Sequence, residues 1–211
     1  MTTTRFCIIR HGETDWNRER RLQGHTDIPL NSQGHKQARQ LQQALAQTGL
    51  TFDALHVSDL TRTQQTAAPL AELYQLTPHY HAQLRERHYG QYQGLTYAEI
   101  QRQWPQHYPR IESRDPDYDM EGGESLNHFR QRIISCFSRQ AQSHPAQTLL
   151  VVTHGGVLEI LHRTASGTPL NTPRDFPIPN AALNWVTYNE GVWMLEKWAD
   201  ESHLQAALDE L

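Results

Sequence analysis

The sequence predicts an α/β fold, a three-layer α/β/α sandwich with a largely parallel central sheet. Three apolar runs, residues 6–9, 52–58 and 148–153, have the length and composition of buried strands. Each precedes a segment with helical character, and such alternation is typical of parallel strands joined by right-handed crossovers. The strands of such a sheet end at one edge, where open α/β folds bind their ligands.

The size and composition of the chain fit one domain covering residues 1–211, because typical domains contain about 100–200 residues. Hydrophobic residues make up 37% of the sequence and are spread throughout it, which argues against disorder. The formal net charge of −4 argues against nucleic acid or an anionic membrane as a partner, since both attract basic proteins. The sequence leaves the oligomeric state open.

Cys7 and Cys136 are the only cysteines, and both lie in apolar surroundings. We expect buried free thiols; a disulfide between the two is an alternative that nothing else in the sequence supports. The first residues lack the basic start and apolar core of a signal peptide. No apolar run approaches the roughly 20 residues of a membrane span. These features together predict a cytoplasmic protein.

The first strand leads directly into Arg10-His11-Gly12, followed by residues 13–20, which can form a helix. An arginine, a histidine and a glycine at this place are typical of a phosphate-binding turn that carries a nucleophile. A strand that merely ends in a polar turn is the ordinary alternative for these residues alone.

The middle of the chain continues the alternation. Residues 32–47 carry apolar side chains at helical spacing, and Gly49 ends this predicted helix. The second strand ends at Ser58, and the next predicted helix carries Arg62 in its first turn. Thr96 and Glu99 form a capping-box pattern at the start of a further helix.

Residues 105–123 show no periodicity and contain prolines, aspartates and tyrosines. A loop of this length is usually functional, and we expect it to act as a lid over a pocket. A long helix is predicted from Ser125. After the third strand, His154 begins another helix, and a hairpin over residues 183–198 completes the fold.

The three strand ends bring His11, Arg62 and His154 to one edge of the predicted sheet. A neutral imidazole can accept a phosphoryl group, and the guanidinium groups of Arg10 and Arg62 are suited to its oxygens. His154, at a glycine-rich helix start, can add a further donor.

The leaving alcohol then needs a proton from a carboxylic acid. Glu86 is our first choice because it lies in a predicted loop, and Glu13 is the second. Taken singly, Arg62 is best interpreted as an ordinary arginine on a helix surface, and Glu86 as a charge exposed to solvent. Taken together with the two histidines, the catalytic interpretation is favoured.

Metal and nucleotide cofactors are not predicted. His79 and His81 are the only close pair of histidines, and no cysteine or carboxylate nearby completes a site. His-Glu-x-x-His, Cys-x-x-Cys, Gly-x-Gly-x-x-Gly and P-loop patterns are all missing from the sequence. We therefore expect no cofactor, and a small phosphorylated metabolite as the partner.

Five blocks, in order along most of the chain, carry a family resemblance. They are Arg10-His11-Gly12-Glu13-Thr14 with Trp16-Asn17, Leu22-Gln23-Gly24 with Pro29-Leu30-Asn31, Ser58-Asp59-Leu60 with Arg62 and Thr66-Ala67, Arg85-Glu86 with Gly90 and Gly94, and Gly122-Gly123-Glu124-Ser125 with Thr153-His154-Gly155-Gly156. With these blocks the sequence resembles the histidine phosphatase superfamily, also called the phosphoglycerate mutase-like family. The resemblance implies a phosphoglycerate mutase-like fold.

The resemblance also implies roles for individual residues. His11 would become phosphorylated, Arg10, Arg62 and His154 would bind the phosphoryl group, and Glu86 would donate and accept the proton. No metal is implied. The expected substrate contacts are Asn17, Gln23, Gly24, Arg87, Tyr89 and Gly155.

The choice between mutase and phosphatase depends on a few positions. Glu86-Arg87-His88-Tyr89-Gly90 is close to the cofactor-dependent phosphoglycerate mutases. However, those mutases carry a lysine where this chain has Tyr97, and a pair of arginines where it has only the isolated Arg110 and Arg114. They also have His-Gly-Asn in place of His154-Gly155-Gly156, a segment that here resembles the phosphatase branch.

A mutase must hold a bisphosphorylated intermediate, which requires a second cationic site. We therefore favour a metal-independent phosphatase that hydrolyses a small phosphate monoester through phosphohistidine on His11. The alternative is a phosphoglycerate mutase that converts 3- to 2-phosphoglycerate with 2,3-bisphosphoglycerate as cofactor. A third possibility is an inactive member that binds phosphorylated ligands.

Overall fold

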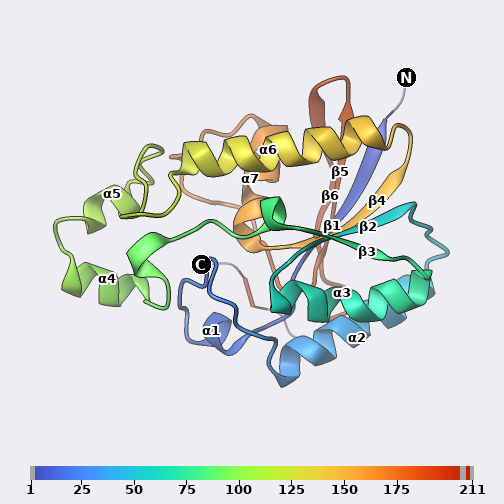
Figure 1. Ribbon diagram of the computed structural model, residues 1–211, viewed down its shortest axis with the longest axis horizontal. Coiled ribbons are helices and arrows are strands. Elements are labelled where there is room, and N and C mark those ends of the chain that lie inside the picture. The colour runs from blue at the N-terminus through green and yellow to red at the C-terminus, as the bar shows by residue number, and fades with distance from the viewer. Residues whose placement is uncertain (1–2, 205–207, 210–211) are drawn as a thin grey trace.

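The computed structural model describes residues 3–204 and 208–209 (Figure 1). A six-stranded sheet lies at its centre, in the order β3-β2-β4-β1-β5-β6. Strands β1 to β4 are parallel, whereas β5 runs antiparallel to both of its neighbours. The strands are β1 (Thr4–Arg10), β2 (Ala54–Ser58), β3 (Pro78–His81), β4 (Thr148–Thr153), β5 (Leu183–Asn189) and β6 (Val192–Asp200).

Helices cover both faces of this sheet. The α-helices are α1 (Asp15–Arg18), α2 (Ser32–Ala46), α3 (Thr61–Tyr74), α4 (Tyr97–Gln103), α5 (Tyr108–Glu112), α6 (Leu126–Ser143) and α7 (Gly155–Ser166). In Figure 1, α2 and α3 lie below the sheet, and α6 and α7 lie above it. The predicted α/β sandwich with a largely parallel sheet is confirmed.

The two layers of the core follow from the alternation of side chains along each strand. In β1, Phe6 and Ile8 pack with the apolar residues of α6 and α7, while Cys7 and Ile9 pack with those of α2 and α3. Successive residues of a strand point to opposite faces, so a continuous apolar run fills both layers. Cys7 and the other cysteine, Cys136, are free and buried, as expected.

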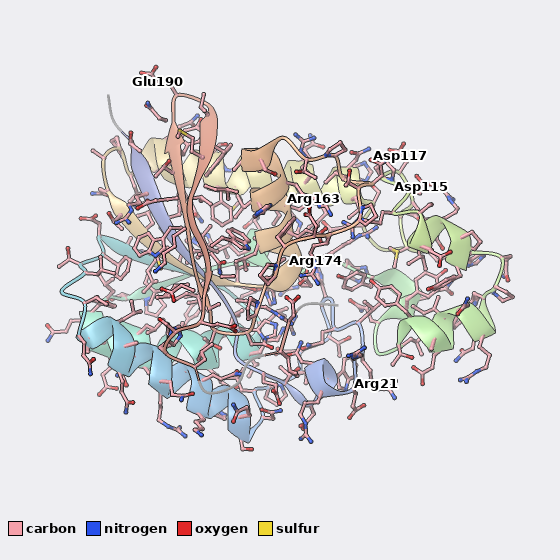
Figure 2. The ribbon with its side chains drawn as sticks, turned by 180° about the vertical axis from the view of Figure 1, so that it is seen from behind. Arg21, Asp115, Asp117, Arg163, Arg174 and Glu190 are labelled. Atoms are coloured by element: carbon pink, nitrogen blue, oxygen red, sulfur yellow. The ribbon has the colours of Figure 1, made fainter. Side chains whose placement is uncertain are left out.

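A third, smaller apolar cluster lies away from the sheet. It consists of Leu22, Tyr92, Ile100, Tyr118 and Met120. Helices α4 and α5 stand beside it at one end of the molecule (Figure 1). In Figure 2, Asp115 and Asp117 mark this end, and Glu190 marks the separate turn between β5 and β6.

The expectation of an unstructured segment over residues 105–123 was wrong in part. Residues 108–112 form α5, and Tyr118 and Met120 are buried. A helix of five residues is too short to show a hydrophobic period, and Pro109 fits its first turn because the missing N–H is not needed there. A lid function for this segment stays a prediction.

Other boundaries differ from the sequence expectation by a few residues. Helix α1 ends at Arg18 instead of Arg20, because Arg20 adopts a left-handed backbone with φ of 55°. The capping box of Thr96 and Glu99 begins α4 as predicted. Within the described part of the chain, no helix is both long enough and apolar enough to cross a membrane.

Candidate active site

His11 lies directly after β1, and backbone pairing holds it in place. Its N–H donates to the carbonyl of Thr153 at 2.9 Å, and the Asn180 amide donates to its carbonyl at 2.8 Å. The imidazole Nδ1 lies 2.7 Å from the carbonyl of Gly12. Because a carbonyl only accepts, Nδ1 carries the hydrogen and Nε2 keeps a lone pair. The side chain is therefore oriented for attack through Nε2.

The surroundings of His11 keep its imidazole neutral. Burial lowers the pKa of His11 well below its ordinary value, and the charges of Arg62 and Arg10 lower it further. The residue is only 3% exposed. A neutral imidazole retains the lone pair that a nucleophile needs.

Arg10 and Arg62 are both buried, and backbone carbonyls hold their guanidiniums. Arg10 Nη1 donates to the carbonyls of Ile178 and Leu208, at 2.8 and 3.1 Å. Arg62 Nη1 and Nη2 donate to the carbonyls of Thr26 and Gly24, at 2.9 and 2.8 Å. These carbonyl partners orient the two guanidiniums, whose planar donor groups suit the oxygens of an anion such as phosphate.

His154 lies beside His11 at the start of α7. The two ring centroids are 5.3 Å apart. Arg62 Nε donates to Nδ1 of His154 at 3.3 Å, so Nε2 carries the hydrogen and donates to Ser58 Oγ at 2.8 Å. Burial, followed by the charge of Arg62, lowers the pKa of His154 well below its ordinary value.

Glu86 follows a short 3₁₀ helix over Ala82–Leu84. Its two carboxylate oxygens accept from the backbone N–H groups of Arg87 at 2.7 Å and Gly156 at 3.0 Å. A Cβ at Gly156 would lie 2.2 Å from Glu86 Oε1, so only glycine allows this approach.

One pocket is lined both by His11, the candidate nucleophile, and by Glu86, the candidate acid. It is lined by His11, Asn17, Arg21, Leu22, Gln23, Arg62, Glu86 and Tyr89. Glu13, the second candidate for the acid, does not line it; its carboxylate accepts from Asn31 Nδ2 at 2.8 Å. Arg10 and His154 are buried next to this pocket without lining it, as are Gly24 and Gly155, and Arg87 lines the neighbouring one.

The comparisons with known proteins agree with this geometry. The sequence profile of the histidine phosphatase superfamily (branch 1) matches residues 6–201. The chain belongs to this superfamily. A phosphoglycerate mutase-like protein 4 of Arabidopsis thaliana is 35% identical over 206 residues, covering 95% of this chain and 86% of the relative.

Two further similarities point in the same direction. A metal-independent phosphoserine phosphatase of Arabidopsis thaliana is 32% identical over 211 residues, covering 96% of this chain and 84% of the relative. The solved structure of Bacillus stearothermophilus YhfR superimposes with a TM-score of 0.84 at 30% identity, covering 95% of this chain and 98% of that one. The family thus contains phosphatases and mutase-like proteins.

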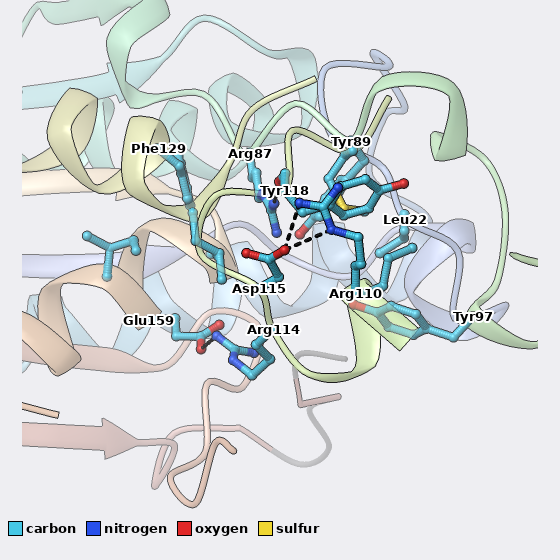
Figure 3. Close-up of a pocket in the computed structure, with 15 residues that line it drawn as sticks. Leu22, Arg87, Tyr89, Tyr97, Arg110, Arg114, Asp115, Tyr118, Phe129 and Glu159 are labelled. Carbon is cyan, nitrogen blue, oxygen red and sulfur yellow. Dashed lines mark hydrogen bonds and ion pairs between the residues drawn. The ribbon is translucent and has the colours of Figure 1, made fainter. Parts of the chain in front are cut away.

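In this member of the superfamily a second pocket adjoins the first, with Leu22 and Tyr89 lining both. Arg87, Arg110 and Arg114 all line this second pocket (Figure 3). Arg110 pairs with Asp115 at 2.7 Å, and Arg114 pairs with Glu159. The fold therefore brings Arg110 and Arg114, which are isolated in sequence, into one pocket with Arg87. It also gives Arg110 and Arg114 a carboxylate partner each.

Several residues of the site had no assigned role in the sequence. Thr66 Oγ1 accepts from the N–H of Gly12 at 2.9 Å, and Arg21 lines the pocket. Ser58 is the last residue of β2, just as His11 and His154 directly follow β1 and β4. This position at the end of a strand is a signal that could have identified Ser58. Asn180 lies in an irregular loop far along the chain, and no local pattern marks it.

A cluster of four histidines lies on the β2–β3 side of the sheet, and the sequence analysis identified only two of them, His79 and His81. His56 and His144 join the pair of His79 and His81, and the ring centroids of all three neighbours lie 5.1 to 5.4 Å from that of His56. Over residues 3–204 and 208–209, no group of three or more histidine, cysteine, aspartate or glutamate side chains is arranged to hold a metal ion.

Proposed function

We propose that this protein is a metal-independent phosphatase that hydrolyses a small phosphate monoester through phosphohistidine on His11. One observation carries the proposal: a neutral imidazole with a lone pair on Nε2 lines the same pocket as Arg62 and Glu86. Nucleophile, anion-binding group and proton donor are the three components that phosphoryl transfer needs.

In the first step, the Nε2 lone pair of His11 forms a bond to phosphorus while the ester P–O bond breaks. The leaving oxygen takes the proton of the Glu86 carboxyl group. The Arg62 guanidinium, which lines the pocket, stabilises the charge on the three equatorial oxygens, and Arg10 and His154, buried beside it, would add donors once the phosphoryl group replaces their present partners.

In the second step, water attacks the phosphorus and gives its proton to the Glu86 carboxylate. The bond between phosphorus and Nε2 breaks, inorganic phosphate leaves, and His11 and Glu86 return to their starting states. Because one group alternates between acid and base, the cycle needs neither a metal nor an organic cofactor.

The substrate contacts of this proposal surround the two pockets. Asn17, Gln23 and Tyr89 line the first, and Tyr89 continues into the second beside Arg87. Gly24 and Gly155 contribute backbone groups near Arg62 and His154. We infer a small phosphorylated metabolite as substrate; its identity and a cytoplasmic location stay predictions.

The second candidate is phosphoglycerate mutase, favoured by the name of the Arabidopsis relative and by the pocket that holds Arg87, Arg110 and Arg114. A bisphosphorylated intermediate would require several uncompensated charges there. Asp115 pairs with Arg110 and Glu159 pairs with Arg114, and these pairs weaken the electrostatic attraction of the pocket for a second dianionic phosphate. We therefore rank the phosphatase first.

The test measures release of phosphate and mutase activity on the same preparations. We expect His11→Ala to lose at least ~10³-fold in kcat on p-nitrophenyl phosphate, and EDTA to leave the wild type unchanged. His128→Gln, which alters an exposed histidine, is the matched control. Full activity of His11→Ala, or loss with EDTA, would contradict the phosphatase.

The mutase candidate is tested with 3-phosphoglycerate and 2,3-bisphosphoglycerate in a coupled assay. We expect slow release of phosphate and no rapid formation of 2-phosphoglycerate. Rapid, bisphosphate-dependent conversion would reverse the ranking. Binding of phosphate without turnover on a broad panel of esters would instead indicate an inactive, ligand-binding member.

A further inference from the structure

The segment that carries Glu86 has no regular secondary structure of its own. Residues 86–89 lie between two short 3₁₀ helices, Ala82–Leu84 and Gly90–Tyr92. Backbone hydrogen bonds of a helix or a strand therefore do not fix the position of Glu86. Side chains must do so, because the carbonyls of this segment are partly buried and need donors.

A single arginine on α6 supplies most of these donors. Arg132 Nη1 donates to the carbonyls of Gln83 at 2.7 Å and Arg85 at 3.0 Å, and Nη2 donates to that of Glu86 at 3.0 Å. Thr153 Oγ1 donates to the carbonyl of Leu84, between them, at 2.8 Å. All four successive carbonyls of residues 83–86 are thus held by side chains.

The guanidinium of Arg132 is itself held by Glu124. Nε and Nη2 donate to the two carboxylate oxygens of Glu124, both at 2.7 Å. Burial opposes the charge of Glu124, but its hydrogen bonds and ion pair with Arg132 still bring its pKa below the ordinary value. Glu124 Oε2 also accepts from the N–H of His88 at 2.9 Å. The pair therefore attaches to the segment on both sides of Glu86.

We propose that the pair of Arg132 and Glu124 positions Glu86 for proton transfer to the leaving group. Arg132 and Glu124 do not line the pocket that holds His11 and Glu86, so they act through the backbone and not on the substrate. The inference rests on the proposed function, because it assigns Glu86 the role of acid. Proton transfer depends on hydrogen-bond geometry, so a displaced backbone lowers the rate of that step first.

Lysine cannot replace Arg132. The ammonium group of a lysine has three donors at one point, whereas Arg132 forms a two-point contact with Glu124 and reaches three carbonyls at once. The substitution Arg132→Lys would keep the charge and lose the geometry. The comparison of Arg132→Lys with Arg132→Met therefore separates charge from position.

The readout is the dependence of kcat/KM on the leaving group, because kcat/KM reports the first step, before Glu86 acts as a base on water. An alkyl phosphate needs protonation of its leaving oxygen, whereas p-nitrophenyl phosphate has a leaving group stable enough to depart without it. We expect Arg132→Met and Arg132→Lys to lose about 10²-fold in kcat/KM on an alkyl phosphate and less than about threefold in kcat/KM on p-nitrophenyl phosphate. Glu124→Gln should show the same pattern more weakly.

The ratio of the two rates is measured on one preparation, so it does not depend on the fraction of folded protein. Arg130→Met, an exposed arginine on the same helix, is the control and should leave the ratio unchanged. Equal losses on both substrates would show a purely structural role and would overturn the inference, as would no loss at all.

A double substitution tests whether Arg132 acts through Glu86. If it does, Glu86→Gln combined with Arg132→Met should be no slower on the alkyl phosphate than Glu86→Gln alone. Additive losses would contradict the inference. If His11→Ala keeps its activity, the proposed function fails whatever Arg132 does; if only the ratio is unchanged, the inference fails and the phosphatase stands.

Discussion

At His11, burial and two guanidinium charges act on the same imidazole, and all of them favour its neutral form. The hydrogen bond from Nδ1 to Gly12 leaves Nε2 as the reactive atom. Under the proposed function, the arginines that attract the anionic substrate also keep the nucleophile unprotonated. Binding of the substrate and activation of His11 would then depend on the same two side chains.

This electrostatic arrangement predicts the pH dependence of activity. The pKa of His11 lies well below 6.5, so protonation should not inactivate the nucleophile between pH 7 and 5.5. An ordinary imidazole would lose about tenfold in kcat/KM by pH 5.5. We expect no such loss on p-nitrophenyl phosphate, after correction for ionisation of the substrate. A tenfold fall per unit below pH 6.5, in protein shown to be folded, would contradict the prediction.

Gly156 gives a second prediction for a single residue. The methyl group of Gly156→Ala would meet Glu86 Oε1, the mobile end of a side chain, so the fold should persist while the carboxylate is displaced. Alanine also favours the helix that begins here. We expect kcat on an alkyl phosphate to fall at least about tenfold with little change in Tm. Unchanged kcat would show that the contact with the Gly156 N–H is dispensable.

At the scale of elements, β2, β3 and the end of α6 bring four histidines together. His56 is buried at their centre, and its Nδ1 lies 2.9 Å from His81 Nε2. Burial, followed by the neighbouring imidazoles of His81, His144 and His79, lowers the pKa of His56 to about 3. The unfolded chain binds a proton near pH 6.5, so it is the unfolded state that gains protons as the pH falls.

The contribution of His56 to the free energy of unfolding should therefore have its full value above pH 6.5 and decrease as the pH falls toward 3. The contribution of His56 to this loss is at most about 5 kcal/mol. We expect His56→Leu to flatten the acid decline in urea unfolding at pH 7, 5.5 and 4.5. His128→Gln, an exposed histidine on α6, is the control. Parallel declines of His56→Leu and wild type would exclude this role for His56.

At the scale of the whole molecule, the site draws on elements from most of the chain. His11 follows β1, Arg62 lies on α3, Glu86 lies in a loop and His154 begins α7. The second pocket lies between the part where α4 and α5 pack over their own small apolar cluster and the first turns of α6 and α7. Under the proposed function, catalysis and choice of substrate would be carried by two adjoining pockets that share Leu22 and Tyr89.

This division predicts that Arg110→Met changes the ranking of substrates without impairing the chemistry. Arg110 lines the second pocket, pairs with Asp115 and lies over the ring of Tyr118. The side chain of Arg110 is 53% exposed, so solvent screens the ion pair and its loss should change stability little. KM values across a panel of phosphate esters should reorder, with kcat on p-nitrophenyl phosphate unchanged. An unaltered ranking would remove this pocket from substrate recognition.

Much of the fold and most of the proposed site residues follow from the sequence. Apolar strands that alternate with helices determine a parallel sheet, and the ends of its strands necessarily share one edge. His11 and His154 follow directly from that rule, and Arg62 follows from the helix start beside it. Glu86 is the first choice from its place in a predicted loop, and the family resemblance supports it over Glu13.

The tertiary structure decided what depends on contacts between distant parts of the chain. Arg132 holds the Glu86 segment across 46 to 49 positions of sequence, and Asn180 holds His11 across 169. Asp115 and Glu159 compensate arginines that are isolated in the sequence. The sequence alone determined the fold class and the proposed reactive groups, because local pattern and topology specify both. Their protonation and position depend on burial and on partners far along the chain, and only the folded molecule brings those together.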